Sequence, residues 1–335
     1  MRKGWFVLMV AFSVLILAAC GAKSQEDVTE ELSAKLDDME GYKASAQMTL
    51  QVGKEPQTYE VEVWYSKPKQ YRVQLKNVEK DQSQIILRNK EGVFVLTPAL
   101  NKSFKFQSNW PENSSQAYLF ESLVKDILQD KEAKFTASED HYVFETETRY
   151  KNNQMLPVQE ISFNKKDLTP ASVKVMDSDR NALVTVEFSK VDLKAKFDAN
   201  SFDMDKNMSG ANLEVPVMAD LAEEEMTVLY PMEMPGANLV DEKEVATENG
   251  KRVVMTFDGE KSYTLIQEKT TEIPEIAVPT SVSGELVDLG FTVGAINETS
   301  IFWSYDGVDY MLASNDLTED EMVSLAKSVQ GSVVK

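Results

Sequence analysis

The feature that most constrains the fold is a two-residue period of apolar side chains that begins just after Tyr42. Every second residue is apolar in residues 44–52, 59–65 and 71–76. This period places apolar side chains on one face of a half-buried antiparallel strand. Shorter runs predict further strands at about residues 84–88, 93–97, 103–106, 142–148, 158–163, 172–176 and 182–188. We therefore expect a β-rich domain whose sheet buries one face.

Helical spacing interrupts this pattern in three places. Apolar residues recur every three or four positions in residues 28–39 and 116–129, and this predicts two amphipathic helices. A third helix is expected at residues 319–329, because Thr318 and Glu321 form a capping box before an apolar run.

Turn and composition signals divide the chain. The Asp258-Gly259 and Asp306-Gly307 dipeptides each predict a tight hairpin turn, since both residues tolerate positive φ. A stretch rich in Ser, Gly, Ala and Pro predicts a linker before a small second domain. The expected division is a signal peptide, a lipidated tether, a first domain, the linker and a small α+β domain, at residues 1–19, 20–26, 27–206, 207–225 and 226–335.

The first twenty residues predict an export signal: Arg2 and Lys3 precede an apolar run that ends in Leu17-Ala18-Ala19-Cys20. Such a run is too short for an ordinary membrane span. The small residues before the single cysteine resemble a bacterial lipobox, which implies cleavage after Ala19 and acylation of Cys20. We expect a protein anchored to the extracytoplasmic face of the cell membrane. A plain signal peptide with a nearby cysteine is the alternative.

The charge of the chain excludes one class of partner. After removal of residues 1–19, 33 basic residues face 55 acidic ones, and the formal charge is −22. Such acidity argues against nucleic acid and against adhesion to anionic lipid head groups. The membrane is therefore expected as a partner only through acyl chains at Cys20, with no other cofactor.

The sequence offers little catalytic or metal-binding chemistry. His141 is the single histidine, and no nucleophile elbow, phosphate loop or dinucleotide motif occurs. Asp203 to Glu214 resembles a calcium loop in its oxygen ligands, but Met208 stands where that loop requires glycine. A carboxylate pair of the glycosidase kind cannot be singled out among so many acids. We predict no catalytic residues and no metal site.

Several local signatures resemble the LolA-like family of lipoprotein carriers. Residues 64–72 resemble its strand, proline-containing turn and aromatic return strand, and residues 91–98 resemble its glycine-turn hairpin. Residues 177–188 and Phe202 are similar to its final meander. The resemblance implies an α+β fold: a curved antiparallel sheet forming an incomplete barrel with helices in its mouth, followed by a smaller C-terminal α+β domain.

The same resemblance implies a cavity between sheet and helices that receives acyl chains. The alternating strands supply its candidate lining residues: Met48, Leu50, Val61, Val63, Tyr71, Val73, Phe94 and Leu96. Lys67 matches the family's lid-latching arginine. Lysine lacks the planar guanidinium fork, which argues against a load-and-release carrier cycle. Periodicity cannot tell an open cavity from one that the helices fill.

The lipobox, this domain and an additional C-terminal module together resemble the YdcC-type sporulation lipoproteins of spore-forming Gram-positive bacteria. We expect a non-catalytic protein that binds a lipid, a lipoprotein or a hydrophobic segment of an envelope protein. The alternative is a regulatory sensor or partner-activating subunit that uses the same fold as an interaction surface.

Overall fold

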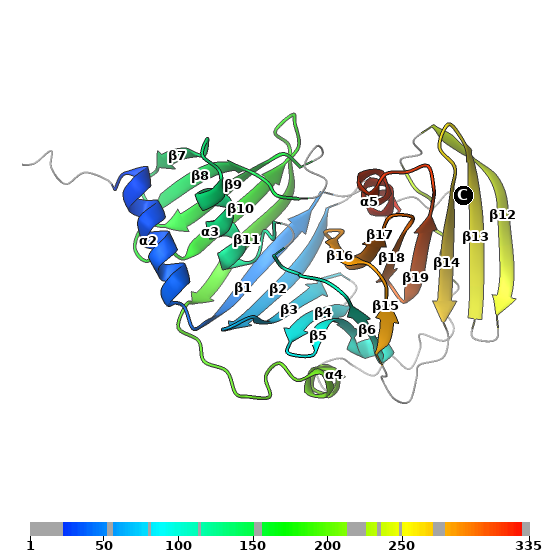
Figure 1. Cartoon of the computed structure of the whole chain (residues 1–335), viewed down its shortest axis with the longest axis horizontal. Helices are drawn as coiled ribbons and strands as arrows, with labels where there is room; N and C mark the ends of the chain where they lie inside the picture. Colours follow the sequence, from blue (N-terminus) through cyan, green and yellow to red (C-terminus); the bar gives the residue numbers. More distant parts are fainter. Residues whose placement is uncertain are drawn as a thin grey trace, which may run out of the picture.

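Two large β-sheets dominate the structure (Figure 1). The computed structural model describes residues 23–51, 56–79, 82–112, 115–150, 156–212, 226–232, 236–247, 250–270 and 279–329. We refer to residues 23–212 as the N-terminal region and to residues 226–329 as the C-terminal region. Both sheets are open, and a few helices pack on them. The predicted α+β class, with an incomplete barrel and a smaller second unit, is confirmed.

The larger sheet has twelve strands in the order β15-β6-β5-β4-β3-β2-β1-β11-β10-β9-β8-β7. Neighbouring strands are antiparallel, except that β15 joins β6 in parallel. The strands are β1 (Gly41–Leu50), β2 (Gln57–Ser66), β3 (Gln70–Asn77), β4 (Ser83–Asn89), β5 (Gly92–Thr97), β6 (Lys102–Phe106), β7 (Lys134–Ala137), β8 (His141–Glu147), β9 (Val158–Asn164), β10 (Pro170–Met176), β11 (Ala182–Asp192) and β15 (Thr280–Val282).

The smaller sheet has seven strands in the order β12-β13-β14-β19-β18-β17-β16. They are β12 (Ala237–Thr247), β13 (Gly250–Gly259), β14 (Tyr263–Thr270), β16 (Glu285–Asp288), β17 (Val293–Asn297), β18 (Ser300–Tyr305) and β19 (Val308–Ala313). The sequence patterns did not predict β7, β12, β15, β16 or β17. Strand β12 is exposed over nearly its whole length, so it has no buried face to impose an alternation.

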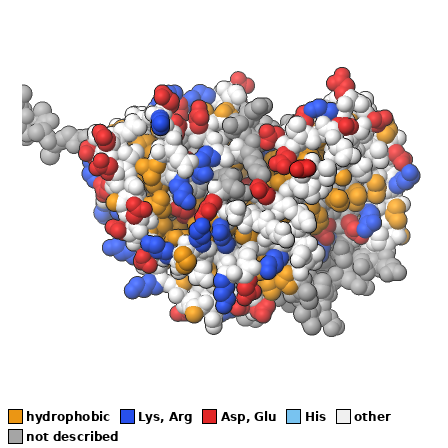
Figure 2. Space-filling view, viewed as in Figure 1, with side chains coloured by type: hydrophobic (Ala, Val, Ile, Leu, Met, Phe, Trp, Pro, Cys, Tyr) orange, Lys and Arg blue, Asp and Glu red, His pale blue; other side chains and the backbone are white. Residues whose placement is uncertain are grey.

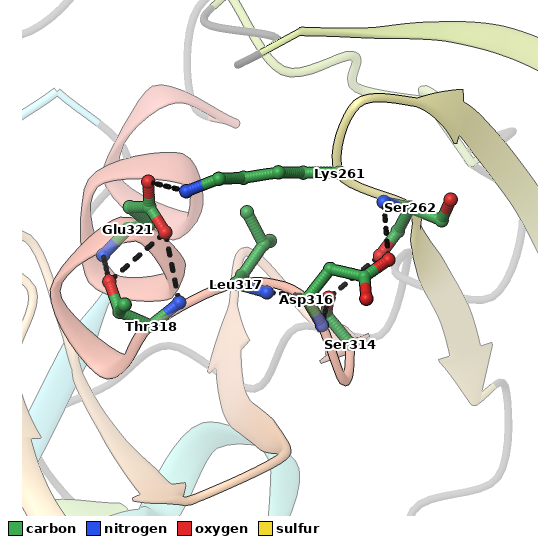
Figure 3. Close-up of polar contacts among 7 residues, drawn as sticks. All are labelled: Lys261, Ser262, Ser314, Asp316, Leu317, Thr318 and Glu321. Atoms are coloured by element: carbon green, nitrogen blue, oxygen red, sulfur yellow. Dashed lines mark hydrogen bonds and ion pairs between the residues drawn. The ribbon is translucent and has the colours of Figure 1, made fainter.

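The described helices are α2 (Gln25–Asp38), the short 3₁₀ helix η1 (Pro98–Leu100), α3 (Phe120–Gln129), α4 (Met204–Asn212) and α5 (Glu319–Ser328). Helices α2 and α3 cross the concave side of the larger sheet (Figure 1). The capping box predicted for α5 is present: the Thr318 hydroxyl accepts from Glu321 N, and Glu321 also pairs with Lys261 (Figure 3). This anchors the helix start beside the β13–β14 hairpin.

The two Asp-Gly dipeptides fold differently. Asp306 and Gly307 both have positive φ, and Tyr305 pairs with Val308, so the predicted two-residue turn is confirmed. Gly259 remains in β13 and pairs with Ala237, while the chain turns over the residues after it. A Cβ at Gly259 would lie 2.1 Å from the Gly236 carbonyl oxygen. Glycine is needed there for close strand approach, so the tight turn predicted at this dipeptide is wrong.

Two predicted connecting segments contain helix. Residues 25–26 of the expected tether belong to α2, which begins after a Ser24 capping box. Residues 207–212 of the expected linker belong to α4, and Asn207 is buried there against Arg72. Residues 213–225 lie outside the described residues. Helix α4 also occupies most of the segment from Asp203 to Glu214 that resembles a calcium loop, so the loop that a calcium site would need is absent from its described part. The division into two domains stays a prediction, because one hydrophobic cluster joins both regions.

Candidate functional site

The candidate site is the concave face of the larger sheet, which we call the inner face. Strand register defines it, because directly opposed residues point to the same side of a sheet. Ala44, Val63, Val73, Ile86 and Val95 form one row across five strands. Every member of this row is buried in the same hydrophobic cluster. The inner face is therefore an apolar floor that runs across the strands.

The structure divides the predicted cavity residues between the two faces. Six of the eight belong to the inner-face cluster: Met48, Leu50, Val61, Val63, Tyr71 and Val73. Phe94 and Leu96 belong to a separate cluster on the opposite, outer face, where Phe202 and Met208 cover them. Strand β5 is apolar on both sides because both of its faces are covered, so its sequence could not show which residues point inward. The assignment of Phe94 and Leu96 to the cavity is wrong.

Helix α3 covers the middle of the inner face with Phe120, Leu123 and Ile127, all buried. A buried polar network between the helix and the sheet holds it. Asp126 pairs with Arg149, accepts from Ser115 Oγ at 2.8 Å and accepts from Gln159 Nε2 at 2.6 Å. Both carboxylate oxygens thus have partners. Losing one partner of such a buried pair is costly, because the other charge stays desolvated.

A second polar contact holds the start of α3. The Tyr42 hydroxyl donates to Glu121 Oε2 at 3.0 Å and accepts from the Phe120 amide at 3.3 Å. Burial raises the pKa of the Glu121 carboxyl, and hydrogen bonds from Tyr71 and Tyr42 oppose that shift. Burial also raises the pKa of Tyr71. The carboxyl is therefore biased toward its neutral form, enclosed by aromatic side chains.

The C-terminal region covers the other end of the inner face. The turn between β16 and β17, residues 289–292, is here called the tongue. Strand β16 is the edge strand of the smaller sheet and lies beside the larger sheet (Figure 1). Leu289 and Phe291 are buried in the hydrophobic cluster that joins both regions, and Phe291 lines a small cavity with Tyr59 and Leu75 of the inner face. A Cβ at Gly290 would lie 3.6 Å from Leu50 Cδ1, and the Thr292 hydroxyl lies 2.9 Å from Gln84 Oε1. The tongue therefore sits directly on residues predicted to line a cavity.

Two small cavities remain where the regions meet. One has a volume of about 60 Å³ and is lined by Tyr59, Leu75, Phe291 and Tyr305, among others. The other holds about 20 Å³ between Met48, Tyr118, Asp288 and Lys327. Small-molecule sites usually occupy roughly 300–1,000 Å³. Neither cavity can hold an acyl chain in this state.

Asp288 and Lys327 bring ionisable groups to the smaller cavity from the C-terminal side. Burial lowers the pKa of the Lys327 ammonium, and the Asp288 carboxylate opposes that shift. Burial raises the pKa of Asp288 in turn. A cavity of this size can hold one water molecule. The pair therefore lies at a junction that is more polar than the floor beneath α3.

The remaining predicted residues lie elsewhere. The Lys67 ammonium is 3.1 Å from the Asp37 carbonyl oxygen and 3.3 Å from Glu40 Oε1, so it contacts the end of α2. Leu17, Ala18, Ala19 and Cys20 lie outside the described residues. Among described residues, no helix is long and apolar enough to cross a membrane. In that same part of the chain, no group of three His, Cys, Asp or Glu side chains is arranged to hold a metal ion.

Sequence reasoning missed the tongue and the Asp126 network. The tongue's apolar residues, Leu289 and Phe291, flank Gly290 in a short irregular segment without periodicity. A glycine between two large apolar residues is the only signal that could have marked it. Asp126 lies in the apolar stripe of a helix, and its partners come from three other segments. Only the fold brings those partners together.

An open, strongly curved sheet with a covered inner face defines the structural class of this protein. The chain belongs to the family described as sporulation protein YdcC-like, which matches residues 1–202. Sporulation protein YdcC of Bacillus subtilis (strain 168) is 53% identical over 336 residues, covering 100% of this chain and 99% of that protein. The predicted family resemblance is thereby confirmed.

Solved structures show weaker similarity. MucB is 12% identical with a TM-score of 0.36, covering 92% of this chain and 98% of that one. The Clostridioides difficile CwlD amidase complex with the GerS lipoprotein gives 19% identity and a TM-score of 0.31, covering 53% and 98%. A LolA superfamily protein from Nitrosomonas europaea gives 10% and 0.30, covering 53% and 98%. At these values no functional argument rests on them.

Proposed function

We propose that the protein is a membrane-anchored, non-catalytic protein that binds a hydrophobic segment of an envelope protein on the inner face of its half-barrel. The observation that carries this proposal is the tongue, a polypeptide turn seated on that face with Gly290 against Leu50. The inner face thus accepts an apolar peptide segment. A place in sporulation is proposed from the name of the Bacillus subtilis relative.

A peptide segment fits this face better than an acyl chain does. An acyl chain needs a continuous tunnel, whereas the two junction cavities measure about 60 and 20 Å³. A ligand on the inner face must therefore replace side chains that the protein itself supplies. The tongue shows that the replaced group can be a turn of polypeptide.

The proposal of a non-catalytic role rests on the kinds of side chain that the inner face presents. Its floor consists of aliphatic and aromatic side chains. The buried acid Asp126 has its oxygens engaged with Arg149, Ser115 and Gln159. Glu121 is enclosed by Tyr42 and Tyr71 and is only 5% exposed. These groups hold α3 in place, which suits binding better than proton transfer to a substrate.

Acylation of Cys20 would place this binding face outside the cytoplasmic membrane, beside membrane and envelope proteins. Replacing Cys20 with Ala tests the anchor. The variant should appear in the soluble fraction of washed cells with unchanged thermal unfolding, since Cys20 precedes the described fold. A variant that stays in the membrane fraction would refute lipid anchoring.

A second candidate function, a partner-activating subunit that uses its outer surface, is favoured by exposed apolar residues. Val240, Val245 and Met311 of the seven-stranded sheet are 60%, 46% and 40% exposed. Figure 2 shows hydrophobic side chains at the surface over that sheet, with charged side chains around them. Exposed patches of this kind mark interaction sites when they are contiguous.

Site-specific photo-crosslinking distinguishes these functions. A benzoylphenylalanine at Leu50 of the inner face should crosslink to apolar peptides of an envelope protein in sporulating cells. The same group at Thr185, which lies in β11 on the other face, serves as the matched control. The group placed at Met311 probes the exposed apolar surface of the seven-stranded sheet. Crosslinks from position 311, with none from position 50, would favour the surface function. Native mass spectrometry that finds a bound lipid would favour an acyl ligand instead.

A further inference from the structure

The tongue is a self-contained turn. The Leu289 amide donates to the Thr292 carbonyl at 2.9 Å, and the Gly290 amide donates to Asp288 Oδ1 at 2.7 Å. Gly290 has a φ of 86°, which glycine adopts without strain. These bonds lie within the turn and do not involve the larger sheet. The tongue can therefore keep its shape when it leaves the inner face.

Polar contacts link the two regions around the tongue. The Gln82 amide donates to Asp306 Oδ1 at 2.6 Å, and the Tyr305 hydroxyl lies 3.2 Å from Gln57 Oε1. With the Thr292–Gln84 contact, they form a polar border around Leu289 and Phe291. Water can replace contacts of this kind at small net cost. The border therefore resists opening less than a continuous apolar core does.

Packing under the tongue is incomplete. The 60 Å³ cavity lies between Leu75 and Phe291, and the 20 Å³ cavity lies beside Gly290. Well-packed interiors contain few voids larger than a water molecule. Asp288 and Lys327 place two ionisable groups at the second cavity. The junction thus resembles a transient interface between domains, for which relative motion is the usual expectation.

A separate contact can keep the two regions together while the tongue moves. Strand β15 pairs with β6 over three residues, and Phe302 packs against Phe104 with ring centroids 5.3 Å apart. Lys102 and Asp309 form an ion pair of 2.8 Å beside them. These contacts lie at the β6 edge of the sheet, whereas the tongue contacts Leu50 of β1 and Gln84 of β4. The edge contacts can serve as a hinge.

We propose that the tongue is an internal occupant of the binding face: it blocks the face in the resting protein, and a partner segment takes its place. This inference rests on the proposed function, since it assigns the regulation of the same face. The displaced turn also describes the partner, which should present two large apolar side chains beside a small residue. A turn or strand end of an envelope protein has this chemistry.

The test uses the full mature chain with Cys20→Ala and a second substitution, Phe291→Ala, that weakens the tongue. Phe257→Ala is the matched control, because Phe257 is equally buried in the seven-stranded sheet but stacks on Tyr263. The probe is a fluorescein-labelled peptide with the sequence of residues 286–295, and a scrambled peptide corrects for non-specific adhesion. Fluorescence anisotropy measures the affinity.

Phe291→Ala should bind the peptide about tenfold more tightly than the parent chain, because the closed state no longer competes as strongly. Phe257→Ala should bind no more tightly than the parent. Hydrogen exchange should show residues 286–295 losing protection in Phe291→Ala, while residues 41–50, which pair with β2 and β11, keep theirs. If that variant does not fold, Thr292→Val removes one hydroxyl and should shift the affinity in the same direction.

The proposal is overturned if Phe291→Ala binds the peptide with unchanged affinity and residues 286–295 exchange only through global unfolding. The tongue would then be a permanent part of the hydrophobic core. The test also separates this inference from the proposed function. If exchange shows opening but no peptide binds, the tongue moves and the binding function fails. If the tongue stays protected while position 50 crosslinks to a partner, the binding function stands and the internal occupant is refuted.

Discussion

Helix α3 and the tongue cover the same apolar floor, but different forces hold them. Asp126 ties α3 to Arg149, Ser115 and Gln159 in a buried network. The tongue has its own closed turn, with polar contacts around it and cavities beneath it. A cover held by buried charge is costly to remove, because the separated groups stay desolvated. A cover held by exchangeable contacts can be released without unfolding the floor.

The largest expected effect is therefore at α3. Asp126→Ala should lower the free energy of unfolding by about 3 kcal/mol, since it leaves Arg149 without its buried partner. Denaturant unfolding of the mature chain measures this. Glu160→Ala is the control, because its ion pair with Lys174 on the same sheet is exposed, and it should change stability by no more than about 0.5 kcal/mol. Equal effects of the two substitutions would show that the Asp126 network holds α3 no more strongly than an exposed ion pair would.

The second prediction concerns the pH dependence of α3. Because burial raises the Glu121 pKa above its ordinary value of 4.5, its stabilising contribution is present below pH 4.5 and declines as pH rises through the raised pKa. Glu121→Gln should therefore match the parent in acid and exceed it at neutral pH, by on the order of 1 kcal/mol. Thermal unfolding across the pH range tests this.

Glu145 provides a control of opposite sign for that experiment. Hydrogen bonds from Arg180 and Lys134 lower its pKa to about 2. Its contribution is present above the ordinary carboxyl value and is lost as pH falls toward the lowered pKa. Glu145→Gln should therefore lose stability relative to the parent at neutral pH and approach it in acid. Parallel pH profiles for both variants would contradict the assigned environments.

The third prediction concerns the tongue. Thr292→Val keeps the side-chain shape but removes the hydroxyl that lies 2.9 Å from Gln84 Oε1 and 3.0 Å from the Ser304 carbonyl oxygen. It should lower overall stability by about 1 kcal/mol, the usual value of one hydrogen bond. Exchange protection should fall in the tongue and not in α3, as native-state hydrogen exchange can measure. A uniform loss of protection would show that the two covers unfold as one unit.

The smallest effect is expected at Lys67, the predicted lid latch. Its ammonium contacts the end of α2, and its side chain is 45% exposed. Lys67→Met should change the free energy of unfolding by about 0.5 kcal/mol or less. A loss comparable to that of Asp126→Ala would show that Lys67 holds the fold closed. Calorimetry of both variants under one buffer condition makes the comparison direct.

Much of the fold could be predicted because strands and helix ends leave local signals. The alternation in residues 44–52 and 59–65 anticipated β1 and β2, and Thr318 with Glu321 anticipated the start of α5. The site was predicted less well. Six candidate residues lie on the inner face, while Phe94 and Leu96 lie on the outer one. A strand covered on both sides has no polar face to reveal its orientation.

Local sequence patterns were enough to predict the family, the strand-rich class, the capped final helix and the Asp306-Gly307 turn, since each leaves a signal among neighbouring residues. The extended Gly259, the packing of α4 on Phe94 and the position of the tongue on Leu50 became evident in the folded structure alone. These features depend on segments far apart in the chain. Burial of the floor is favourable whichever segment covers it, and only the folded chain shows which one does.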